Sequence, residues 1–339
     1  MARRWKRYVG TTLFLILALL IVGITFTIGW RPFIGPRTRA LTNRTFEATP
    51  ARLERGRFMV NAVYGCVACH SERDRNAPGW PPLADKLGAG TVFGEGAELP
   101  GRLIAPNLTP DKETGVGNWT DDMLARSIRE GIGHDGRTLF PIMPYLNYRE
   151  MPDEDLASVI VYIRSLAPVR NPLPQTEIIF PVKYLIRGAP EPVTAWVPQP
   201  DLSDQVKRGA FLTRMASCAD CHTPQERGQV KPGLELAGGL LFEAPQGMVM
   251  AANITPDASG IGYYDEDLFL QSMRTGKVKA RVLSPIMPWY FYGRMTDEDL
   301  KAMFAYLRTL KPVKHTVDNT ESPSACKLCG LKHGGGDRN

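Results

Sequence analysis

The chain has 339 residues, which is room for two domains of ordinary size together with an anchor and connecting segments. Its formal net charge is +6, but four of the basic side chains lie within the first eight residues, so the charge gives no support to nucleic-acid binding. Gly and Pro are abundant, with 32 and 28 residues, which indicates compact domains rich in loops rather than long regular elements.

The N-terminus predicts a membrane anchor within residues 1–30. After a basic flank, residues 9–30 contain no charged side chain, and as a helix they would span about 33 Å, enough for a bilayer core. A cleaved signal peptide would have a shorter apolar region and a small-residue cleavage site. Arg3-Arg4 raises twin-arginine export as an alternative, but general secretion is favoured. The basic flank predicts a cytoplasmic N-terminus, with the rest of the chain outside and tethered through residues 31–50.

Two copies of a short cysteine motif dominate the chain. Cys66-Val-Ala-Cys69-His70 and Cys218-Ala-Asp-Cys221-His222 each place a histidine directly after a Cys-x-x-Cys pair. In a c-type haem site the two thiols add to the haem vinyl groups and the histidine ligates the iron. A lone Cys-x-x-Cys is also compatible with a zinc knuckle, a redox pair or a disulfide, and the adjacent histidine is what favours haem.

The motifs belong to a longer repeat, which indicates a duplicated domain rather than a solenoid. Residues 151–169 align without a gap with residues 295–313, with ten identities in nineteen positions. The other matched segments are Arg55-Gly56 with Arg208-Gly209, Asn107–Asp111 with Asn253–Asp257, and Pro141–Pro144 with Pro285–Pro288.

Each repeat is predicted to end in an amphipathic helix. Apolar residues recur at helical spacing in both copies, and Asp and Glu crowd both helix starts, where they favour the helix dipole. Thr296 is the expected N-cap of the second helix. The first copy has Pro152 at that position, and we expect Asp153 to cap it instead. The apolar positions are Leu156, Val159, Ile160 and Ile163, then Leu300, Met303, Phe304 and Leu307.

Met143 and Met287 are the predicted second axial ligands of the two irons. Each lies between prolines in a matched loop, whereas the other methionines fit a core. Ligation by His and Met raises the reduction potential and fills both axial positions, which suits electron transfer. His134 is the alternative ligand in the first repeat, but the matching stretch of the second, residues 277–281, has no histidine, so we interpret it as a loop residue.

Each repeat resembles a class I cytochrome c domain, with a helix before Cys-x-x-Cys-His, a loop-rich middle, a Met-bearing loop and a closing helix. The whole is similar to membrane-anchored bacterial dihaem c-type cytochromes, including the cytochrome subunits of periplasmic alcohol and aldehyde dehydrogenases. Dehydrogenase-associated members often carry three haems, whereas this chain has two complete motifs.

The resemblance implies a mainly α fold with tandem domains at residues 51–170 and 201–315, following one transmembrane helix. It implies two covalent haem c groups, whose four propionates would bring the formal charge of the exported part to about −2. The implied thioether positions are Cys66, Cys69, Cys218 and Cys221; the implied proximal ligands are His70 and His222; and the implied distal ligands are Met143 and Met287.

The remaining segments are a connector and a tail. The connector, residues 171–200, is rich in proline and is predicted to be semi-rigid and extended. The tail, residues 316–339, contains Cys326-Lys-Leu-Cys329 without an adjacent histidine, so a third ordinary haem is not expected. A local disulfide, a zinc or iron site that adds His333 and also His315, and a partner contact remain open there.

Three classes of function follow. The first is an electron carrier on the periplasmic side of the inner membrane, between a dehydrogenase or quinol-oxidising complex and a soluble cytochrome or terminal oxidase. The second is the same molecule as a fixed subunit of a dehydrogenase or respiratory complex. The third is a dihaem peroxidase, which needs an iron position that can open, and a methionine at both sites argues against it.

Overall fold

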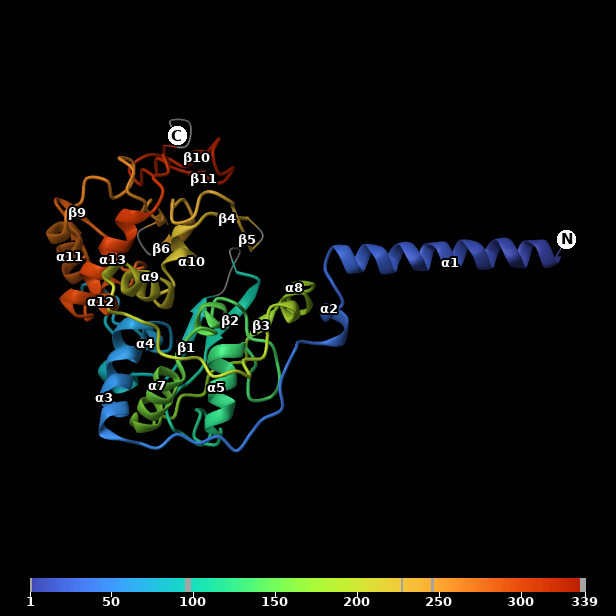
Figure 1. The fold of residues 1–339 in the computed structure, drawn as a ribbon, viewed down its shortest axis with the longest axis horizontal. Helices are drawn as coiled ribbons and strands as arrows, with labels where there is room; N and C mark the ends of the chain where they lie inside the picture. The colour runs from blue at the N-terminus through green and yellow to red at the C-terminus, as the bar shows by residue number, and fades with distance from the viewer. Residues whose placement is uncertain (1, 95–98, 227, 245–246, 336–339) are drawn as a thin grey trace.

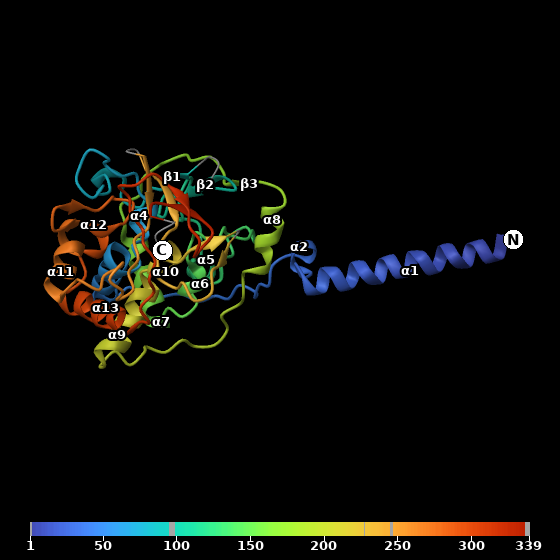
Figure 2. The ribbon, with the colours of Figure 1, turned by 90° about the horizontal axis from the view of Figure 1, so that it is seen from above.

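The computed structural model describes residues 2–94, 99–226, 228–244 and 247–335. Helix α1 (Ala2–Phe26) projects away from the rest of the molecule as a single rod (Figures 1 and 2). Its segment Arg4–Phe26 is long and apolar enough to cross a membrane, and none of its most apolar window is buried in the protein. The predicted apolar helix is therefore present, and it ends at Phe26, before the predicted limit of residue 30.

The segment after α1 is held against the body rather than hanging free. Helix α2 (Arg31–Ile34) lies beside α8 (Val182–Leu185) of the connector, where Arg187 Nη1 donates a hydrogen bond to the Pro32 carbonyl at 3.1 Å. Residues 35–49 then form an irregular strap that crosses the first half of the body (Figure 1).

The body consists of two units with the same order of helices, which we call the first unit (residues 50–170) and the second unit (residues 201–315). In the first unit the helical elements are α3 (Pro50–Phe58), the π-helical turn η1 (Met59–Val63), α4 (Cys66–Cys69), η2 (Ala84–Lys86), α5 (Asp121–Glu130), α6 (Tyr145–Tyr148) and α7 (Asp153–Ser165). In the second unit they are α9 (Gln205–Met215), α10 (Cys218–His222), α11 (Glu266–Thr275), α12 (Trp289–Tyr292) and α13 (Asp297–Thr309).

A glycine lets the first and last helices of each unit pack backbone to backbone. A Cβ atom on Gly56 of α3 would lie 2.0 Å from the Ser158 carbonyl oxygen of α7, and one on Gly209 of α9 would lie 1.9 Å from the Ala302 carbonyl oxygen of α13. No side chain larger than hydrogen fits such a crossing. The matched Arg-Gly pairs of the sequence therefore mark the two helix crossings.

The neighbouring arginines reinforce the same crossings. Arg55 Nε donates to Asp155 at 2.6 Å, and Arg208 Nε donates to Asp299 at 2.8 Å. Both aspartates are buried in the first turn of the closing helix, so each ion pair satisfies a carboxylate that would be costly to bury alone.

Short strands occupy the loop-rich middle of each unit, and the sequence did not predict them. In the first unit β1 (Thr91–Gly94) pairs antiparallel with β2 (Gly101–Ala105), and the connector adds β3 (Glu177–Ile178) to the other side of β2. The connector also contains the turn η3 (Ile186–Gly188). The other pairs are β4 (Gln225–Glu226) with β5 (Gln229–Val230), β6 (Leu241–Ala244) with β7 (Gly247–Met250), β8 (Lys277–Val278) with β9 (Arg281–Val282), and β10 (Ser324–Ala325) with β11 (Lys332–His333).

One of the two predicted helix caps is right and the other is wrong. Thr296 caps α13, because its hydroxyl accepts a hydrogen bond from the Asp299 amide at 3.1 Å. In α7, Pro152 occupies the N-cap position and makes no side-chain cap. Asp153 is not the cap, because its carboxylate instead accepts from Arg129 and from the Val197 amide of the connector. Its role is to fasten the connector to the first unit.

Candidate functional site

The two Cys-x-x-Cys segments form matching helical turns. In α4 and α10 the residue before the first cysteine has a left-handed backbone, with φ of 57° at both Gly65 and Ser217. Glycine adopts this conformation without steric cost, whereas Ser217 does so at a position that L residues seldom occupy. The same turn geometry is therefore kept in the second unit despite a less favourable residue.

His70 and His222 are buried and oriented in the same way. The Nδ1 atom of His70 lies 2.8 Å from the Pro106 carbonyl oxygen, and that of His222 lies 2.7 Å from the Ala252 carbonyl oxygen. Because a carbonyl only accepts, Nδ1 carries the proton in the neutral ring and Nε2 keeps its lone pair. Burial lowers the pKa of both histidines, which favours this neutral form. A neutral imidazole held through Nδ1 is the usual arrangement of a metal-ligating histidine.

The segment after each histidine is tied back by equivalent backbone bonds. The Gly90 amide donates to the His70 carbonyl at 2.8 Å, and the Gly238 amide donates to the His222 carbonyl at 2.6 Å. The hydroxyl of Ser71 accepts from the Gly88 amide at 2.9 Å, as that of Thr223 accepts from the Leu236 amide at 3.1 Å. These bonds fix the chain on both sides of each histidine.

Asn107 and Asn253 connect the histidine-supporting loops to the ends of the closing helices. The Asn107 side-chain amide donates to the Val169 carbonyl at 2.8 Å, and the Asn253 amide donates to the Val313 carbonyl at 2.8 Å. Both asparagines are buried. The sequence repeat marked these residues as matched, but their role becomes visible only once the loop and the helix end are seen together.

The Pro-Ile-Met-Pro loops also have matching local structure. The Tyr145 amide donates to the Met143 carbonyl at 2.7 Å, and the Trp289 amide donates to the Met287 carbonyl at 2.7 Å. Both methionines are half-buried and pack against the core. Farther along the same loops, the hydroxyls of Tyr148 and Tyr292 donate to the carbonyls of Tyr64 and Ala216, two residues before each first cysteine. Each methionine loop is therefore fastened to the cysteine turn of its own unit.

His134 has a different environment from His70 and His222. Its ring stacks on Trp119, with the ring centroids 4.2 Å apart and the planes inclined by 28°. It lies in the turn between the residues of the Ile132–Thr138 bridge. The expectation of a loop residue agrees with this placement.

The donor groups fit a covalently bound haem. Burial raises the pKa of the Cys66 and Cys218 thiols to about 12. Among the described residues, the buried indole Nε1 of Trp289 has no hydrogen-bond acceptor. A propionate is an acceptor that would satisfy it, and Trp289 follows Met287 by only two residues.

The two units meet along their cysteine turns and methionine loops. Helix α6 of the first unit contacts α9. Beside this contact, Asn147 Nδ2 donates to Ser217 Oγ at 3.1 Å and to the Asp220 carboxylate at 3.2 Å, both at the cysteine turn of the second unit. Helix α12 of the second unit contacts η1 in a reciprocal way. A single hydrophobic cluster runs through both units.

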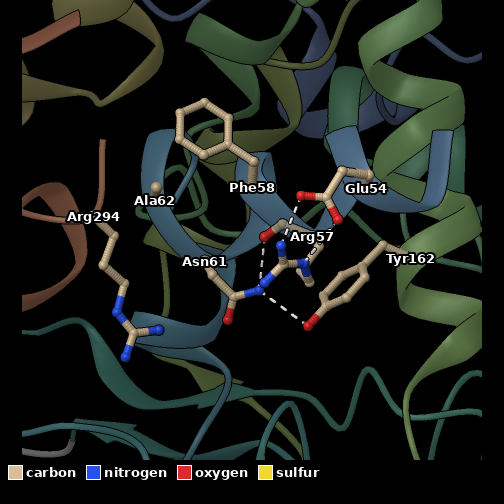
Figure 3. A pocket seen from close by; sticks show the side chains of 7 residues that line it. All are labelled: Glu54, Arg57, Phe58, Asn61, Ala62, Tyr162 and Arg294. Atoms are coloured by element: carbon tan, nitrogen blue, oxygen red, sulfur yellow. Dashed lines mark hydrogen bonds and ion pairs between the residues drawn. The ribbon is translucent and has the colours of Figure 1, made fainter. Parts of the chain in front are cut away.

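A surface pocket opens at the same junction but does not belong to the site. Its walls come from α3, η1 and Tyr162 of α7 in the first unit and from Arg294 of the second, and none of the predicted ligands lines it (Figure 3). Arg57 pairs with Glu54, and Asn61 bonds Tyr162, so the polar groups on its wall are already partnered. The residues that line this pocket do not form a group of side chains that could bind a cofactor or catalyse a reaction.

Comparisons with known proteins agree with this site. Residues 206–311 match the family model for cytochrome c. The chain is 32% identical over 304 residues to the fructose dehydrogenase cytochrome subunit of Gluconobacter japonicus, covering 81% of this chain and 57% of that protein. It is 30% identical over 326 residues to a nicotinate dehydrogenase subunit of Pseudomonas putida, covering 90% of this chain and 25% of that protein.

A third relative is closer to this chain in length. It is a diheme cytochrome c-type protein of Cereibacter sphaeroides, 26% identical over 266 residues, with 74% of this chain and 83% of that protein covered. The chain spans about a quarter of the nicotinate dehydrogenase subunit and 62% of the cytochrome c subunit of the Gluconacetobacter polyoxogenes alcohol dehydrogenase (quinone). The matched turns, the oriented histidines and these similarities agree: residues 206–311 match the cytochrome c family, and the relatives of the whole chain include cytochrome c subunits and a diheme cytochrome c.

Proposed function

We propose that this protein is a dihaem electron carrier that passes single electrons between protein partners. The observation that carries the proposal is the pair of Cys-x-x-Cys-His turns whose histidines, His70 and His222, both have Nδ1 bonded to a backbone carbonyl. Each turn offers two thiols for thioether bonds and one Nε2 lone pair for iron.

In this proposal residues 51–170 and 201–315 are tandem class I cytochrome c domains. Cys66, Cys69, Cys218 and Cys221 would hold two haem c groups, with Met143 and Met287 as distal ligands. Bound haem iron supplies a reversible one-electron change between ferric and ferrous states. The equivalent hydrogen bonds that orient the histidines and fasten the methionine loops support the same role in both domains.

The junction between the units supports electron exchange within the molecule. The cysteine turn of the second unit contacts α6 of the first through Asn147, and one cluster of buried hydrophobic residues extends through both units. Such packing would keep the separation of two redox sites constant. We propose that the chain provides an internal two-step path rather than two independent sites.

The partners are proposed from the relatives. Relatives named as cytochrome subunits of alcohol, fructose and gluconate dehydrogenases favour a dehydrogenase as the electron donor, with this chain as its fixed subunit. The carrier form would accept electrons from a separate dehydrogenase or quinol-oxidising complex. In both forms a soluble cytochrome or a terminal oxidase would be the acceptor.

We further propose that α1 anchors the chain in the bacterial inner membrane with the haem domains in the periplasm. The support is the apolar segment Arg4–Phe26 and the basic residues that precede and begin it. The experiment for the whole proposal is purification of the full chain in detergent from its native host, followed by a spectroelectrochemical titration. We expect two low-spin one-electron centres, no peroxide turnover and a co-purifying dehydrogenase subunit. A high-spin centre with peroxide turnover would instead establish the peroxidase class.

A further inference from the structure

The C-terminal tail folds back onto the second unit and brings four metal-binding side chains together. Cys326, Cys329 and His333 lie in the tail, and His315 lies six residues after α13. All four residues are buried, and their ligand atoms all lie within 4.8 Å of one another. We propose that these residues bind one zinc ion in a closed Cys2His2 site that fastens the tail to the second unit.

The sulfur–nitrogen distances fit a tetrahedral ion. Cys326 Sγ lies 3.4 Å from His315 Nε2, Cys329 Sγ lies 3.4 Å from His333 Nε2, and the two Nε2 atoms are 2.8 Å apart. With Zn–S near 2.3 Å and Zn–N near 2.0 Å, neighbouring sulfur and nitrogen ligands of a tetrahedron are about 3.5 Å apart. Two nitrogen ligands would be about 3.3 Å apart, so binding of the ion would separate the two rings by about 0.5 Å. Two thiolates and two imidazoles complete the coordination of zinc and leave no position for water, which is the composition of a structural site.

The hydrogen bonds of the two imidazoles point to a cation between them. His315 Nδ1 lies 2.9 Å from the Ala237 carbonyl oxygen, and His333 Nδ1 lies 3.1 Å from the Gly334 carbonyl oxygen. Carbonyls only accept, so both Nδ1 atoms carry hydrogen. The two Nε2 atoms then face each other across 2.8 Å, where either a shared proton or a metal ion must lie between their lone pairs. The thiols can donate to these nitrogens, but that does not separate the lone pairs. A bound cation resolves the conflict, with the carbonyls as outer partners that orient the rings.

Comparison of the two units shows how the site is built. Asn171, just after the first unit, has its amide bonded to Thr114 at 2.9 Å and donates from Nδ2 to the Ala89 carbonyl at 2.9 Å. His315 has the equivalent place: its amide donates to Ser259 at 3.0 Å, and its Nδ1 reaches the Ala237 carbonyl. The imidazole thus reproduces the bond made by the asparagine and adds a second nitrogen, Nε2, which faces the cysteines.

The other three ligands come from one small hairpin. Strands β10 and β11 pair Ser324 with His333, and the Gly330 amide donates to the Cys326 carbonyl at 2.9 Å in the turn between them. Gly330 has a φ of +76°, which favours glycine there. Cys326 and Cys329 also pack on Leu234 and Ala237 of the loop that follows the second cysteine turn. A metal ion would therefore join the hairpin, the end of the second unit and this loop.

The test measures metal in the full-length protein with its haems attached, purified without chelators or added metal. Zinc and iron are measured by plasma mass spectrometry, and haem is measured separately as the pyridine haemochrome. We expect one zinc per chain and no iron beyond the haem iron. X-ray absorption at the zinc edge should give two sulfur ligands near 2.3 Å and two nitrogen ligands near 2.0 Å.

His315→Asn is the sharpest variant, because asparagine at the equivalent position of the first unit already makes the same bond to a carbonyl. We expect it to lose zinc while its haem content stays unchanged. Cys326→Ser with Cys329→Ser should lose zinc as well. Asn171→His is the matched control, since no cysteine pair other than the haem-binding one is proposed in the first unit, and its zinc content should equal that of the unchanged chain.

The unchanged chain decides the proposal even if a variant fails to fold. Zinc-free protein in which mass spectrometry of alkylated peptides finds Cys326 joined to Cys329 would overturn it. Zinc-free protein with both thiols reduced that also fails to take up added zinc would overturn it in favour of a hydrogen-bonded cluster. Non-haem iron in place of zinc would overturn the choice of metal. None of these results bears on the two haems, so the electron-transfer proposal is tested separately.

Discussion

The side-chain amide of Asn107 lies 2.8 Å from the carbonyl oxygen of Val169, and this bond joins the loop beside His70 to the end of α7. The Asn107 side-chain oxygen also accepts from the Thr109 amide at 2.9 Å. Asn253 repeats both bonds in the second unit, to Val313 and Thr255. Each asparagine therefore holds a loop and a helix end that are far apart in the sequence.

Replacing either asparagine by alanine should destabilise its own unit. Asn107→Ala and Asn253→Ala each leave a buried backbone amide, that of Thr109 or Thr255, without its acceptor, which costs about 1–3 kcal/mol per group. Denaturant unfolding of the haem-loaded protein, followed by circular dichroism, measures the loss. Asn118→Ala removes one exposed bond to Lys112 and is the control, with an expected change within about 0.5 kcal/mol. Equal effects of the buried and exposed replacements would contradict this role.

The helix crossings should tolerate no side chain at Gly56 or Gly209. A methyl group there would lie about 2 Å from a backbone carbonyl of α7 or α13, so the helices must separate. We expect Gly56→Ala and Gly209→Ala to lower the free energy of unfolding by about 1–3 kcal/mol or more. Gly188→Ala is the control, because a Cβ atom there would have no described neighbour within 4 Å. Unchanged thermal midpoints in both crossing variants would show that the helices are not packed this closely.

The methionine assignments predict a selective spectroscopic loss. Met143→Ala and Met287→Ala should each remove half of the near-infrared methionine-to-iron band of the oxidised protein and lower the reduction potential of one centre. The core methionines Met151 and Met295 are fully buried and serve as controls. Met151→Leu and Met295→Leu should keep the whole band, because their volume is nearly conserved. Full retention of the band in either alanine variant would mean that a different methionine ligates that iron.

The strap of residues 35–49 should stay attached down to low pH. Arg39 donates two hydrogen bonds of 2.7 Å to Asp122. Burial raises the pKa of Asp122, but the hydrogen bonds from Arg39 and Thr42 together with the charge of Arg39 lower it more, so it lies below its ordinary value of 3.8. Because its pKa is lowered on folding, the Asp122 carboxylate stabilises the folded state above pH 3.8, and this stabilisation is lost as the pH falls through the lowered pKa. Glu130, which also binds Arg39, has the opposite effect on the pH dependence of stability. Burial raises its pKa, so its contribution to the stability of the folded state is present below pH 4.5 and is lost as the pH rises through the raised pKa.

Hydrogen exchange can check this pH range. The amides of Thr42 and Phe46 donate to Asp122 and Asp121, at 2.7 and 2.9 Å. We expect both amides to remain protected at pH 5 and to lose protection only below pH 3.8, after correction for the intrinsic exchange rate. Arg39→Gln should remove the protection at pH 7, since it leaves the buried Asp122 carboxylate without its ion pair, at a cost of about 3 kcal/mol. Protection that is independent of both pH and Arg39 would contradict the assignment.

The sequence predicted those features that depend on short motifs or on helical periodicity. The Cys66–His70 and Cys218–His222 turns, the N-terminal apolar helix and the closing helix with Thr296 as its cap are local, and each has its own signal. The repeat also identified the Arg-Gly pairs as matched but did not indicate what they do. Their role in the close packing of the first and last helices of each unit follows only from the geometry of the helix crossings.

Features that depend on tertiary contacts were missed. The sequence does not indicate that the connector adds β3 to the first unit, or that Asp153 binds Val197 instead of capping α7. The carbonyls that orient His70 and His222 belong to Pro106 and Ala252, and a backbone acceptor has no side-chain signature. For His315 the sequence leaves metal binding open, because its contact with Cys326, eleven residues later, depends on how the tail folds back.

The strap has a consequence for how the molecule can meet a partner. Helix α1 ends at Phe26, and the chain is fastened again at Pro32 by Arg187 and then at Arg39 by Asp122. If α1 is embedded in a membrane as proposed, only residues 27–31 would separate the bilayer from the body. Such a short connection would restrict the rotation of the body relative to the membrane. One side of the body would then face the lipid surface, and the opposite side would face the aqueous space. This orientation would determine which side of the body a membrane-bound electron donor and a soluble electron acceptor can each reach, before any specific contact forms.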